Sequence, residues 1–270
     1  MTIINTNIKS QVTQLALTQN ERLQNHAIAQ LSTGQRLNSA ADDAAGVGIS
    51  TRMAAQVQSL NMAVRNANDG ISMLQTADGA AQGLSDILHR MKEISVQYLN
   101  GTNGTSDKSA IDTEFNQLTS ALGNIVDNTS WNGMSVLKLG TSKSFQVGAA
   151  AGDAVSATFT DFSAAANAVK IVQSLTSVAD GTTLTKIDNA VDAISTTRAS
   201  WGATINRLQY AADNSATTAS NLSVSRSRIQ DTDYAQATAD LARAQIIQQA
   251  GNAMLTQANQ LPYMVLSLLK

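Results

Sequence analysis

The chain has 270 residues, carries a formal net charge of -2 and contains no cysteine. Without cysteine it can form neither a disulfide scaffold nor a thiolate zinc site, and His26 and His89 alone supply too few ligands for a multi-histidine metal centre. The weak negative charge offers no basic surface for nucleic acid or for an anionic membrane. Composition therefore argues against these classes and predicts a protein without metal or cofactor.

Long helices are the structure that the composition favours. Aromatic residues make up only 4% of the chain, and there is a single proline. Because a proline inside a helix costs about 3 kcal/mol, its scarcity permits long uninterrupted helices. The chain does not start with a charged segment followed by an apolar run, and no stretch approaches about 18 consecutive apolar residues. On composition alone we expect a cytoplasmic protein.

The first expected helix carries a narrow apolar stripe near the N-terminus. The stripe is flanked by glutamine and asparagine and consists of Ile8, Val12 and Leu15, continued loosely by Leu23, Ile28 and Leu31. A helix with so little apolar surface is weak alone, so we expect it to need partner helices.

Two further helices are expected in the first half of the chain. The stripe of one runs from Met53 to Leu74 in steps of four and three and drifts on to Ile94. The segment 100–107 is typical of a turn, and Ser106 or Asp107 is the expected N-cap of a shorter helix with a stripe over 111–125. Sustained steps of four and three predict a left-handed supercoil against partner helices.

The middle of the chain has the pattern of short strands. Asn132-Gly133 signals a turn, and short runs of alternating apolar residues follow it. We expect strands at Val136–Leu139, Ser144–Val147 and Val155–Phe159. The segment Ser163–Thr185 is rich in Ala, Ser and Thr and is expected to form a loop with one short helix.

The last third of the chain returns to the helical pattern. A stripe in alternating steps of four and three runs from Ile187 to Ile229, and a narrower one runs from Ala237 to Val265. The two halves of the chain are then expected to pair along one rod. The predicted fold class is therefore mainly α, a long antiparallel helical coiled-coil rod with a small β-hairpin patch at the centre of the chain.

The motifs that carry chemistry in other proteins have simpler structural interpretations here. Gly46-Val47-Gly48 lacks the third glycine and the preceding strand of a nucleotide loop, so we interpret it as a helix entry. Asp42-Asp43, and likewise Asp231 and Asp233, are interpreted as helix caps and not as catalytic carboxylate pairs. No P-loop, nucleophile elbow or HExxH zinc motif is present. We therefore predict a protein that is not an enzyme.

Two long stretches of the sequence resemble bacterial flagellin. They are residues 1–80, with LSTGQRLNSAADDAAGVGIS, and residues 226–270, with the terminal VLSLL. The segment LHRMKEISVQ also looks like the inner-rod helix of that family. The resemblance covers roughly the first 140 and the last 85 residues, and the middle corresponds to the variable region of the family.

The resemblance implies a structural subunit of the bacterial flagellar filament, which self-assembles into a helical polymer for swimming or swarming. It implies a terminal coiled-coil domain of residues 1–40 and 233–270 that lines the filament core. It also implies a rod domain of residues 41–232, with its β-hairpin region at about 131–162. The short middle indicates a form without outer domains. We expect the terminal segments to be mobile in the monomer and helical in the polymer, because they bury too little apolar surface alone.

Two sets of candidate site residues follow from the resemblance. Polymerisation is assigned to the terminal stripes, namely Ile8, Val12, Leu15, Leu23, Leu31, Leu241, Leu255, Val265, Leu266, Leu268 and Leu269. In many flagellins the inner-rod helix is recognised by an animal Toll-like receptor, and the matching positions are Leu88, Arg90, Glu93, Ile94, Gln97 and Glu114. The last four residues of the first set also resemble the stretch sensed by cytosolic inflammasome receptors.

The resemblance also revises the expected location and partners. Flagellins leave the cell through a dedicated export channel without a cleaved signal, so we expect a secreted protein in the extracellular filament. The expected partners are copies of the chain itself, the flagellar export apparatus with its chaperone, the filament cap and hook-associated proteins, and host innate immune receptors. Neither nucleic acid binding nor membrane insertion is expected.

Three alternatives stay open at this point. A hook–filament junction protein shares the termini, although such relatives match less tightly around AADDAAGVGIS. A flagellin with a metalloprotease insert would need an HExxH motif and a larger middle. A helical-hairpin signalling module like a chemoreceptor tip would not need the central strands.

Overall fold

The computed structural model describes residues 6–178 and 181–267, with side chains described up to residue 260. Its contacts divide the chain into two compact units, one within residues 1–55 and 221–270 and the other within residues 56–220. The expected boundaries near residues 40 and 233 belong to the assembled filament and stay a prediction. Across the described ranges, none of the helices combines the length and the hydropathy needed to cross a bilayer.

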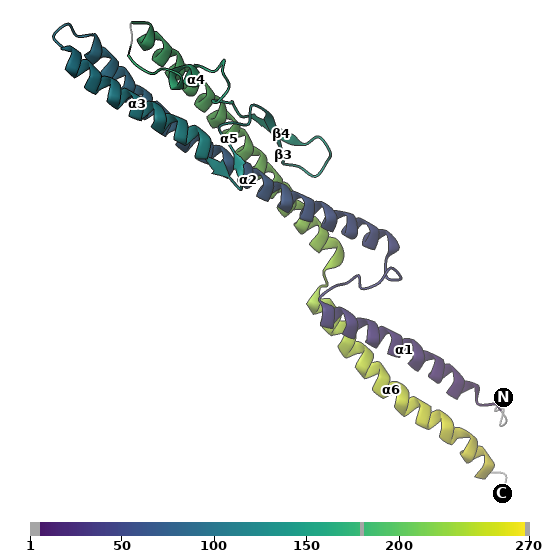
Figure 1. The fold of residues 1–270 in the computed structure, drawn as a ribbon. Coiled ribbons are helices and arrows are strands. Elements are labelled where there is room, and N and C mark those ends of the chain that lie inside the picture. The colour runs from purple at the N-terminus through teal and green to yellow at the C-terminus, as the bar shows by residue number, and fades with distance from the viewer. Residues whose placement is uncertain (1–5, 179–180, 268–270) are drawn as a thin grey trace. The chain divides into compact units, whose positions relative to one another are not determined.

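The first unit contains α1 (Ile8–Thr33) and α6 (Tyr234–Ser267), which lie side by side in Figure 1, and also residues 44–55 and 221–230 at the ends of two further helices. Helices α1 and α6 are antiparallel, because Asn7 at the start of α1 reaches Ala258 while Asn20 reaches Ala244. Asn7 caps α1 by accepting a hydrogen bond from the backbone N–H of Ser10 at 3.1 Å. The Asp233 carboxylate caps α6 by accepting one from the N–H of Ala235 at 2.9 Å, which confirms its predicted role.

The second unit is built on the long helices α2 (Ala44–Leu99), α3 (Thr105–Asn128) and α5 (Gly181–Gln230), which run alongside one another in Figure 1. Ion pairs connect them, with Arg90 of α2 to Glu114 of α3 at 2.7 Å and Lys92 of α2 to Asp188 of α5 at 2.5 Å. With the two small antiparallel sheets between α3 and α5, this architecture confirms the predicted fold class.

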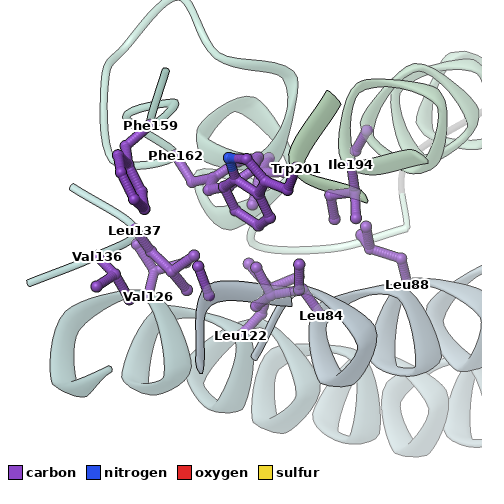
Figure 2. Packing of buried hydrophobic residues seen from close by; sticks show 14 of the residues in the cluster. Leu84, Leu88, Leu122, Val126, Val136, Leu137, Phe159, Phe162, Ile194 and Trp201 are labelled. Carbon is purple, nitrogen blue, oxygen red and sulfur yellow. The ribbon is translucent and has the colours of Figure 1, made fainter. Parts of the chain in front are cut away.

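The apolar stripes predicted on these helices form one continuous core. Figure 2 shows Trp201 at the centre of the labelled cluster, beside Phe162 and above Leu84 and Leu122. The Trp201 ring is tilted against Phe159 and meets the edge of Phe162, with centroid separations of 6.1 and 6.4 Å. A few large aromatic residues thus complete a core otherwise lined by Ala, Val, Leu, Ile and Met.

The β structure is smaller than expected and partly displaced. Strands β1 (Ser130–Trp131) and β2 (Met134–Ser135) form a short hairpin across Asn132 and Gly133, whose φ values of 48° and 77° are those of the turn that this dipeptide favours. Strands β3 (Ser142–Gln146) and β4 (Ala154–Thr158) form a second antiparallel hairpin, close to two of the expected strands.

The strand expected at Val136–Leu139 is wrong, because this segment forms a bend. Consecutive residues Val136 and Leu137 are both fully buried in the core, whereas a half-buried strand would point them to opposite faces. The short helix expected between 163 and 185 is α4 (Ala168–Gln173). The expected cap of α3 is also displaced: the helix begins at Thr105, and Asp107 lies inside its first turn, where its carboxylate accepts the N–H of Gly104 at 3.0 Å.

The hairpin of β3 and β4 is attached to the helices through its own backbone. The hydroxyl of Ser215 on α5 donates to the carbonyl of Val147 at 2.8 Å, and the side-chain amide of Asn66 on α2 donates to the carbonyl of Gln146 at 3.1 Å. At the other strand, the indole N–H of Trp201 donates to the carbonyl of Thr158 at 2.9 Å. Trp201 therefore serves both as the largest core residue and as an anchor of the hairpin.

Replacing this residue tests the account of the core. We expect Trp201→Ala to lower the free energy of unfolding by about 3 to 5 kcal/mol, because it leaves a large cavity and removes the bond to Thr158. Urea unfolding of the full chain followed by far-ultraviolet circular dichroism measures the loss. Tyr210→Ala on the same helix is the control, since Tyr210 is 76% exposed and its removal should change stability by less than about 0.5 kcal/mol. Equal losses in the two variants would contradict the role given to Trp201.

Candidate functional site

The contact between α1 and α6 is formed by small and polar side chains. Along α1 the residues that face α6 are buried or half-buried and recur in steps of three and four: Ser10, Thr13, Leu17, Asn20, Gln24, Ala27 and Leu31. Along α6 the matching positions are Ala237, Leu241, Ala244, Gln248, Gly251, Leu255 and Ala258. We call these two rows the terminal seam. Its spacing is that of a coiled coil, but only a minority of its residues are large and apolar.

The apolar stripe predicted on α1 lies outside this seam. Ile8, Val12, Leu15 and Leu23 are 54% to 66% exposed. Leu31, also predicted, is half-buried in the seam. We call the four exposed residues the outer stripe of α1. The sequence pattern could not show that the helix pair turns these residues away from α6, and their role in polymerisation stays a prediction.

On α6 the outcome is reversed. The predicted Leu241 and Leu255 are half-buried in the terminal seam, whereas Ile246, Ile247 and Met254 are 47% to 66% exposed and were not predicted. These three lie outside the four-and-three pattern, so a search for periodic apolar positions passes over them. The side chains of the predicted Val265 and Leu266 lie outside the described residues, as do Leu268 and Leu269 altogether.

Burial of the exposed apolar side chains of both helices against another surface would contribute a large favourable free energy. Full burial of one Val, Leu, Ile or Met contributes about 1.5 to 3 kcal/mol, and eight such residues, counting Ile28, are exposed on the described part of this pair. Exposed apolar clusters of this kind mark interaction surfaces in soluble proteins. The helix pair therefore exposes a candidate interaction surface.

The segments that leave α1 and enter α6 are fastened to each other. Gly34, with φ of 70°, ends α1 in the left-handed conformation, and its carbonyl accepts the N–H of Thr232 at 3.0 Å. Arg36 closes the end of α5: its backbone N–H donates to the carbonyl of Gln230 at 2.7 Å, and its guanidinium donates to that of Ile229 at 2.6 Å. These bonds satisfy carbonyls that have no partner within the helix.

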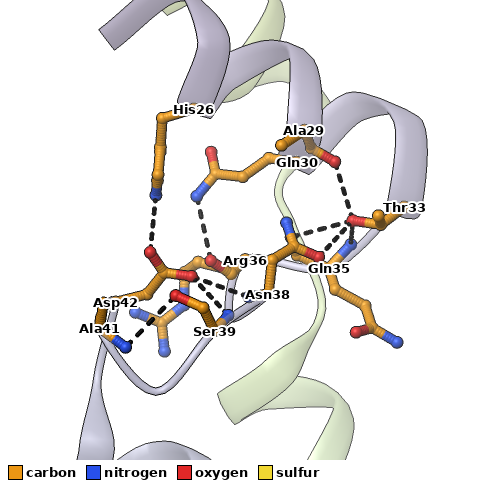
Figure 3. Close-up of polar contacts among 10 residues, drawn as sticks. All are labelled: His26, Ala29, Gln30, Thr33, Gln35, Arg36, Asn38, Ser39, Ala41 and Asp42. Atoms are coloured by element: carbon orange, nitrogen blue, oxygen red, sulfur yellow. Dashed lines mark hydrogen bonds and ion pairs between the residues drawn. The ribbon is translucent and has the colours of Figure 1, made fainter. Parts of the chain in front are cut away.

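A second group of contacts folds the segment after α1 into a compact loop, drawn in Figure 3. One carboxylate oxygen of Asp42 accepts the N–H groups of Asn38 and Ser39 at 2.9 and 2.8 Å, and the other lies 3.4 Å from Nε2 of His26 on α1. Its neighbour Asp43 accepts the N–H of Gly46 at 2.9 Å, which confirms the predicted cap of α2. Asp42 itself is a loop residue and not a helix cap.

The environment of Asp42 lowers the pKa of its carboxyl group. The main causes are the hydrogen bonds from the N–H groups of Ser39 and Asn38, with a smaller contribution from His26. A lowered pKa means that the charged form stabilises the folded loop. This stabilisation is present above the pKa of the unfolded chain and is lost as pH falls through the lower pKa of the folded one.

An NMR titration of the carboxyl carbons tests this assignment. We expect Asp42 to titrate below the ordinary value of 3.8, and the amide signals of Asn38 and Ser39 to move with it. In Asp42→Asn the two amides should exchange faster with solvent at neutral pH, because a neutral amide oxygen is a weaker acceptor. A carboxyl titration at or above 3.8 would contradict the loop geometry.

The six residues predicted for receptor recognition separate into two groups. Arg90, Glu93, Gln97 and Glu114 are exposed, and the Arg90 guanidinium donates to the carboxylates of Glu114 and Glu93 at 2.7 and 3.1 Å. Its hydrogen bond with Glu114, and then the one with Glu93, raise the pKa of Arg90, which keeps it charged. Leu88 and Ile94 are fully buried in the core, so their side chains do not form part of the exposed surface.

The described residues hold no cluster of metal ligands. Within residues 6–178 and 181–267 no three His, Asp or Glu side chains gather closely enough to hold a metal ion. His89 is exposed, and the only contact described for His26 is the one with Asp42. The exposed residues predicted for polymerisation and for receptor recognition lie on the terminal helix pair and around the ion pair of Arg90 with Glu114, and these roles stay predictions.

Comparisons with known proteins agree with this architecture. The sequence model of the bacterial flagellin N-terminal helical region matches residues 4–141, and that of the bacterial flagellin C-terminal helical region matches residues 184–269. Among curated relatives, a flagellin of Halalkalibacterium halodurans is 37% identical over 247 residues, covering 90% of this chain and 91% of that protein. A flagellin of Xenorhabdus nematophila is also 37% identical, with 99% of each chain covered.

A longer relative and a solved structure complete the comparison. Polar flagellin F of Vibrio parahaemolyticus is 44% identical over 153 residues, which cover 56% of this chain and 41% of that protein. The crystal structure of Bacillus cereus flagellin superposes with a TM-score of 0.50 at 32% identity, covering 56% of this chain and 88% of that one. Helical ends that match along nearly the whole of their length, joined by a short middle, show that the chain belongs to the bacterial flagellin family, whose members are structural subunits of the flagellar filament.

Proposed function

We propose that this chain builds the extracellular filament through the outward-facing apolar side chains of α1 and α6. The observation that carries the proposal is the outer stripe of α1: Ile8, Val12, Leu15 and Leu23 are each more than half exposed on a helix that already has a partner. In a filament the helix pairs of neighbouring copies would bury these side chains. Ile246, Ile247 and Met254 of α6 would supply the complementary surface.

The contact between copies must be heterologous to produce a filament. A surface on α1 that meets a different surface on α6 of the next copy repeats without closing, and such contacts generate open helical polymers. A hook–filament junction protein, the alternative suggested by the sequence, would stop after a ring. The family models and the relatives described above are flagellins, and nothing favours that alternative.

A single charge placed in the outer stripe tests the proposal. We expect Leu15→Asp to raise the critical concentration for salt-induced polymerisation by more than tenfold, because burying an unpaired carboxylate at a contact costs more than about 1.4 kcal/mol. Sedimentation of polymer after salting out measures this concentration, and electron microscopy shows whether the polymer is a filament.

Gln14→Asp is the matched control for this experiment. Gln14 is exposed, precedes Leu15 directly and lies outside both the outer stripe and the terminal seam, so the same charge is added one residue away. We expect it to polymerise like the parent chain. Long filaments of Leu15→Asp at the parent's concentration would overturn the assignment of the outer stripe.

Order in the terminal segments is part of the same proposal. We infer that the domain of residues 1–40 and 233–270 lines the filament core, and that its helix pair, α1 and α6, becomes rigid only on assembly. Two features support this inference: the seam between α1 and α6 is small and polar, and much of the apolar surface of both helices finds no cover within the chain. Residues 41–232 would form the rod domain, because the continuous core lies there.

Location and further partners follow from the family and from a structural, non-catalytic role. We propose that the chain is secreted through the flagellar export apparatus with the help of a chaperone that binds its C-terminal helix. Outside the cell it would meet the filament cap and the hook-associated proteins. The proposal is supported by the family match over both helical ends, and it assigns no enzymatic activity to the chain.

Host recognition is a second proposed role, favoured by the exposed charged patch on α2 and α3. Arg90 bridges Glu93 and Glu114 and presents a fixed guanidinium at the surface, with Gln97 nearby on the same helix. A charged group held in place by two partners is a suitable anchor for a receptor because little side-chain freedom is lost on binding.

A cell reporter for the Toll-like receptor tests this second role. We expect Arg90→Ala to lower the response about tenfold, which corresponds to a loss of about 1.4 kcal/mol at one contact. Arg65→Ala is the control, because Arg65 is exposed on the same helix away from the patch. Circular dichroism should show the same helix content for both variants. Equal responses to both variants would contradict the proposal.

A further inference from the structure

A buried asparagine interrupts the terminal seam at its centre. Asn20 is only 4% exposed, and its side-chain amide donates to the backbone carbonyl of Ala244 at 2.7 Å and to the side-chain oxygen of Gln248 at 3.1 Å. Both N–H bonds of that amide are therefore used by α6. A buried amide that is fully paired in one arrangement loses hydrogen bonds in any other, and leaving them unmade is costly.

A second contact in the seam depends on the same arrangement. Leu17 packs into the space left by Gly251, with its Cδ2 atom 2.5 Å from the position that a Cβ on residue 251 would occupy. Gly251 is the only glycine between residues 234 and 267. No other position of α6 can therefore receive the Leu17 side chain at this distance.

The seam needs such contacts because the hydrophobic effect alone favours a different arrangement. The side chains facing α6 around Asn20 are mostly small or polar, while the outer stripe of α1, Ile8, Val12, Leu15 and Leu23, is apolar and exposed. Turning α1 about its own axis would bury this stripe against α6 within one molecule. The connections of Gly34 to Thr232 and of Arg36 to Gln230 lie at one end of the pair, whereas the contacts of Asn20 and Leu17 with α6 lie along its middle.

We propose that Asn20, paired with Gln248 and supported by the Leu17–Gly251 contact, selects the rotation of α1 that keeps its outer stripe facing away from α6. A polar residue in a coiled-coil seam specifies one arrangement at a cost in stability, whereas an apolar residue stabilises several. Asn20 is in this sense a specificity residue of the terminal pair. Its consequence for assembly rests on the proposed function, because only a polymer makes use of the outward stripe.

The absence of cysteine from the chain makes the rotation directly measurable. One reporter carries Thr13→Cys with Leu255→Cys, two seam positions one turn away from the Leu17–Gly251 contact on the antiparallel helices. The other carries Val12→Cys with Leu255→Cys, which places the first cysteine on the outer stripe instead. Each reporter is oxidised in the full-length chain, both in dilute solution and after salting out, and the intramolecular disulfide is quantified by mass spectrometry.

With Asn20 present, we expect the seam reporter to oxidise at least fivefold faster than the stripe reporter in salted-out material. In Asn20→Leu we expect this ratio to fall towards one, while the thermal midpoint of the terminal helices rises, because a buried polar group has been replaced by an apolar one. Asn25→Leu is the control: it adds the same side chain at an exposed position of α1 and should leave the ratio unchanged. A residue that only supports the fold would lower the thermal midpoint when it is replaced. A specificity residue is instead shown by a higher thermal midpoint together with a lower ratio of seam to stripe oxidation rates.

Two results would overturn the inference. The first is a ratio of seam to stripe oxidation rates in Asn20→Leu that equals the ratio in the chain with Asn20. The second is a fall of this ratio in Asn25→Leu that is as large as the fall in Asn20→Leu. Filament formation by the chain without cysteines is measured separately by electron microscopy, so a failure to polymerise counts against the proposed function alone. If filaments form and the ratio does not respond to Asn20, the proposed function stands and the inference about Asn20 fails.

Discussion

Close approach of α1 and α6 is possible because small residues line much of their contact. This constraint limits the apolar area that the two helices bury against each other. Ala27, Ala237 and Ala244 let the two backbones come near each other but contribute little apolar area. Polar bonds, such as the two from Asn20, then define the pairing. Most of the large apolar side chains of α1 remain exposed in this arrangement, where another molecule can cover them.

The second unit, in contrast, buries its large apolar side chains within the chain itself. Its helices meet in a core of fully buried Leu, Ile and Met residues, closed by Trp201, Phe159 and Phe162. Such a core is stable within one chain, and it requires nothing from neighbouring copies. The two units thus differ in where their large apolar side chains lie, buried in one and exposed on the helix pair of the other.

Much of the helical architecture could be predicted from residue spacing, and the errors have identifiable causes. Long stripes such as Ile187 to Ala219 were found because large apolar residues repeat on one face and end up buried together. The expected strand at Val136 was wrong because two adjacent apolar residues enter the core from a bend, which a short apolar run cannot distinguish from a strand.

The candidate site was predictable in part for the same reason. Apolar residues on α1 could be identified, but the sequence did not indicate which face would meet α6, because the true seam is marked by Ser10, Asn20 and Ala27 and not by large side chains. A search for small and polar residues in steps of three and four would have found it. Leu88 and Ile94, taken from a family motif, proved to be core residues because a motif records neighbours along a helix without recording which face they occupy.

The way the central hairpin is held has a consequence for how this protein can diverge. Ser215, Asn66 and Trp201 bind carbonyl oxygens of the hairpin, and every amino acid supplies the same carbonyl. Ser144 and Ser156, which pair across the two strands and are both exposed, contribute nothing to these anchors. Such positions can therefore change in sequence while the hairpin keeps its place on the helices.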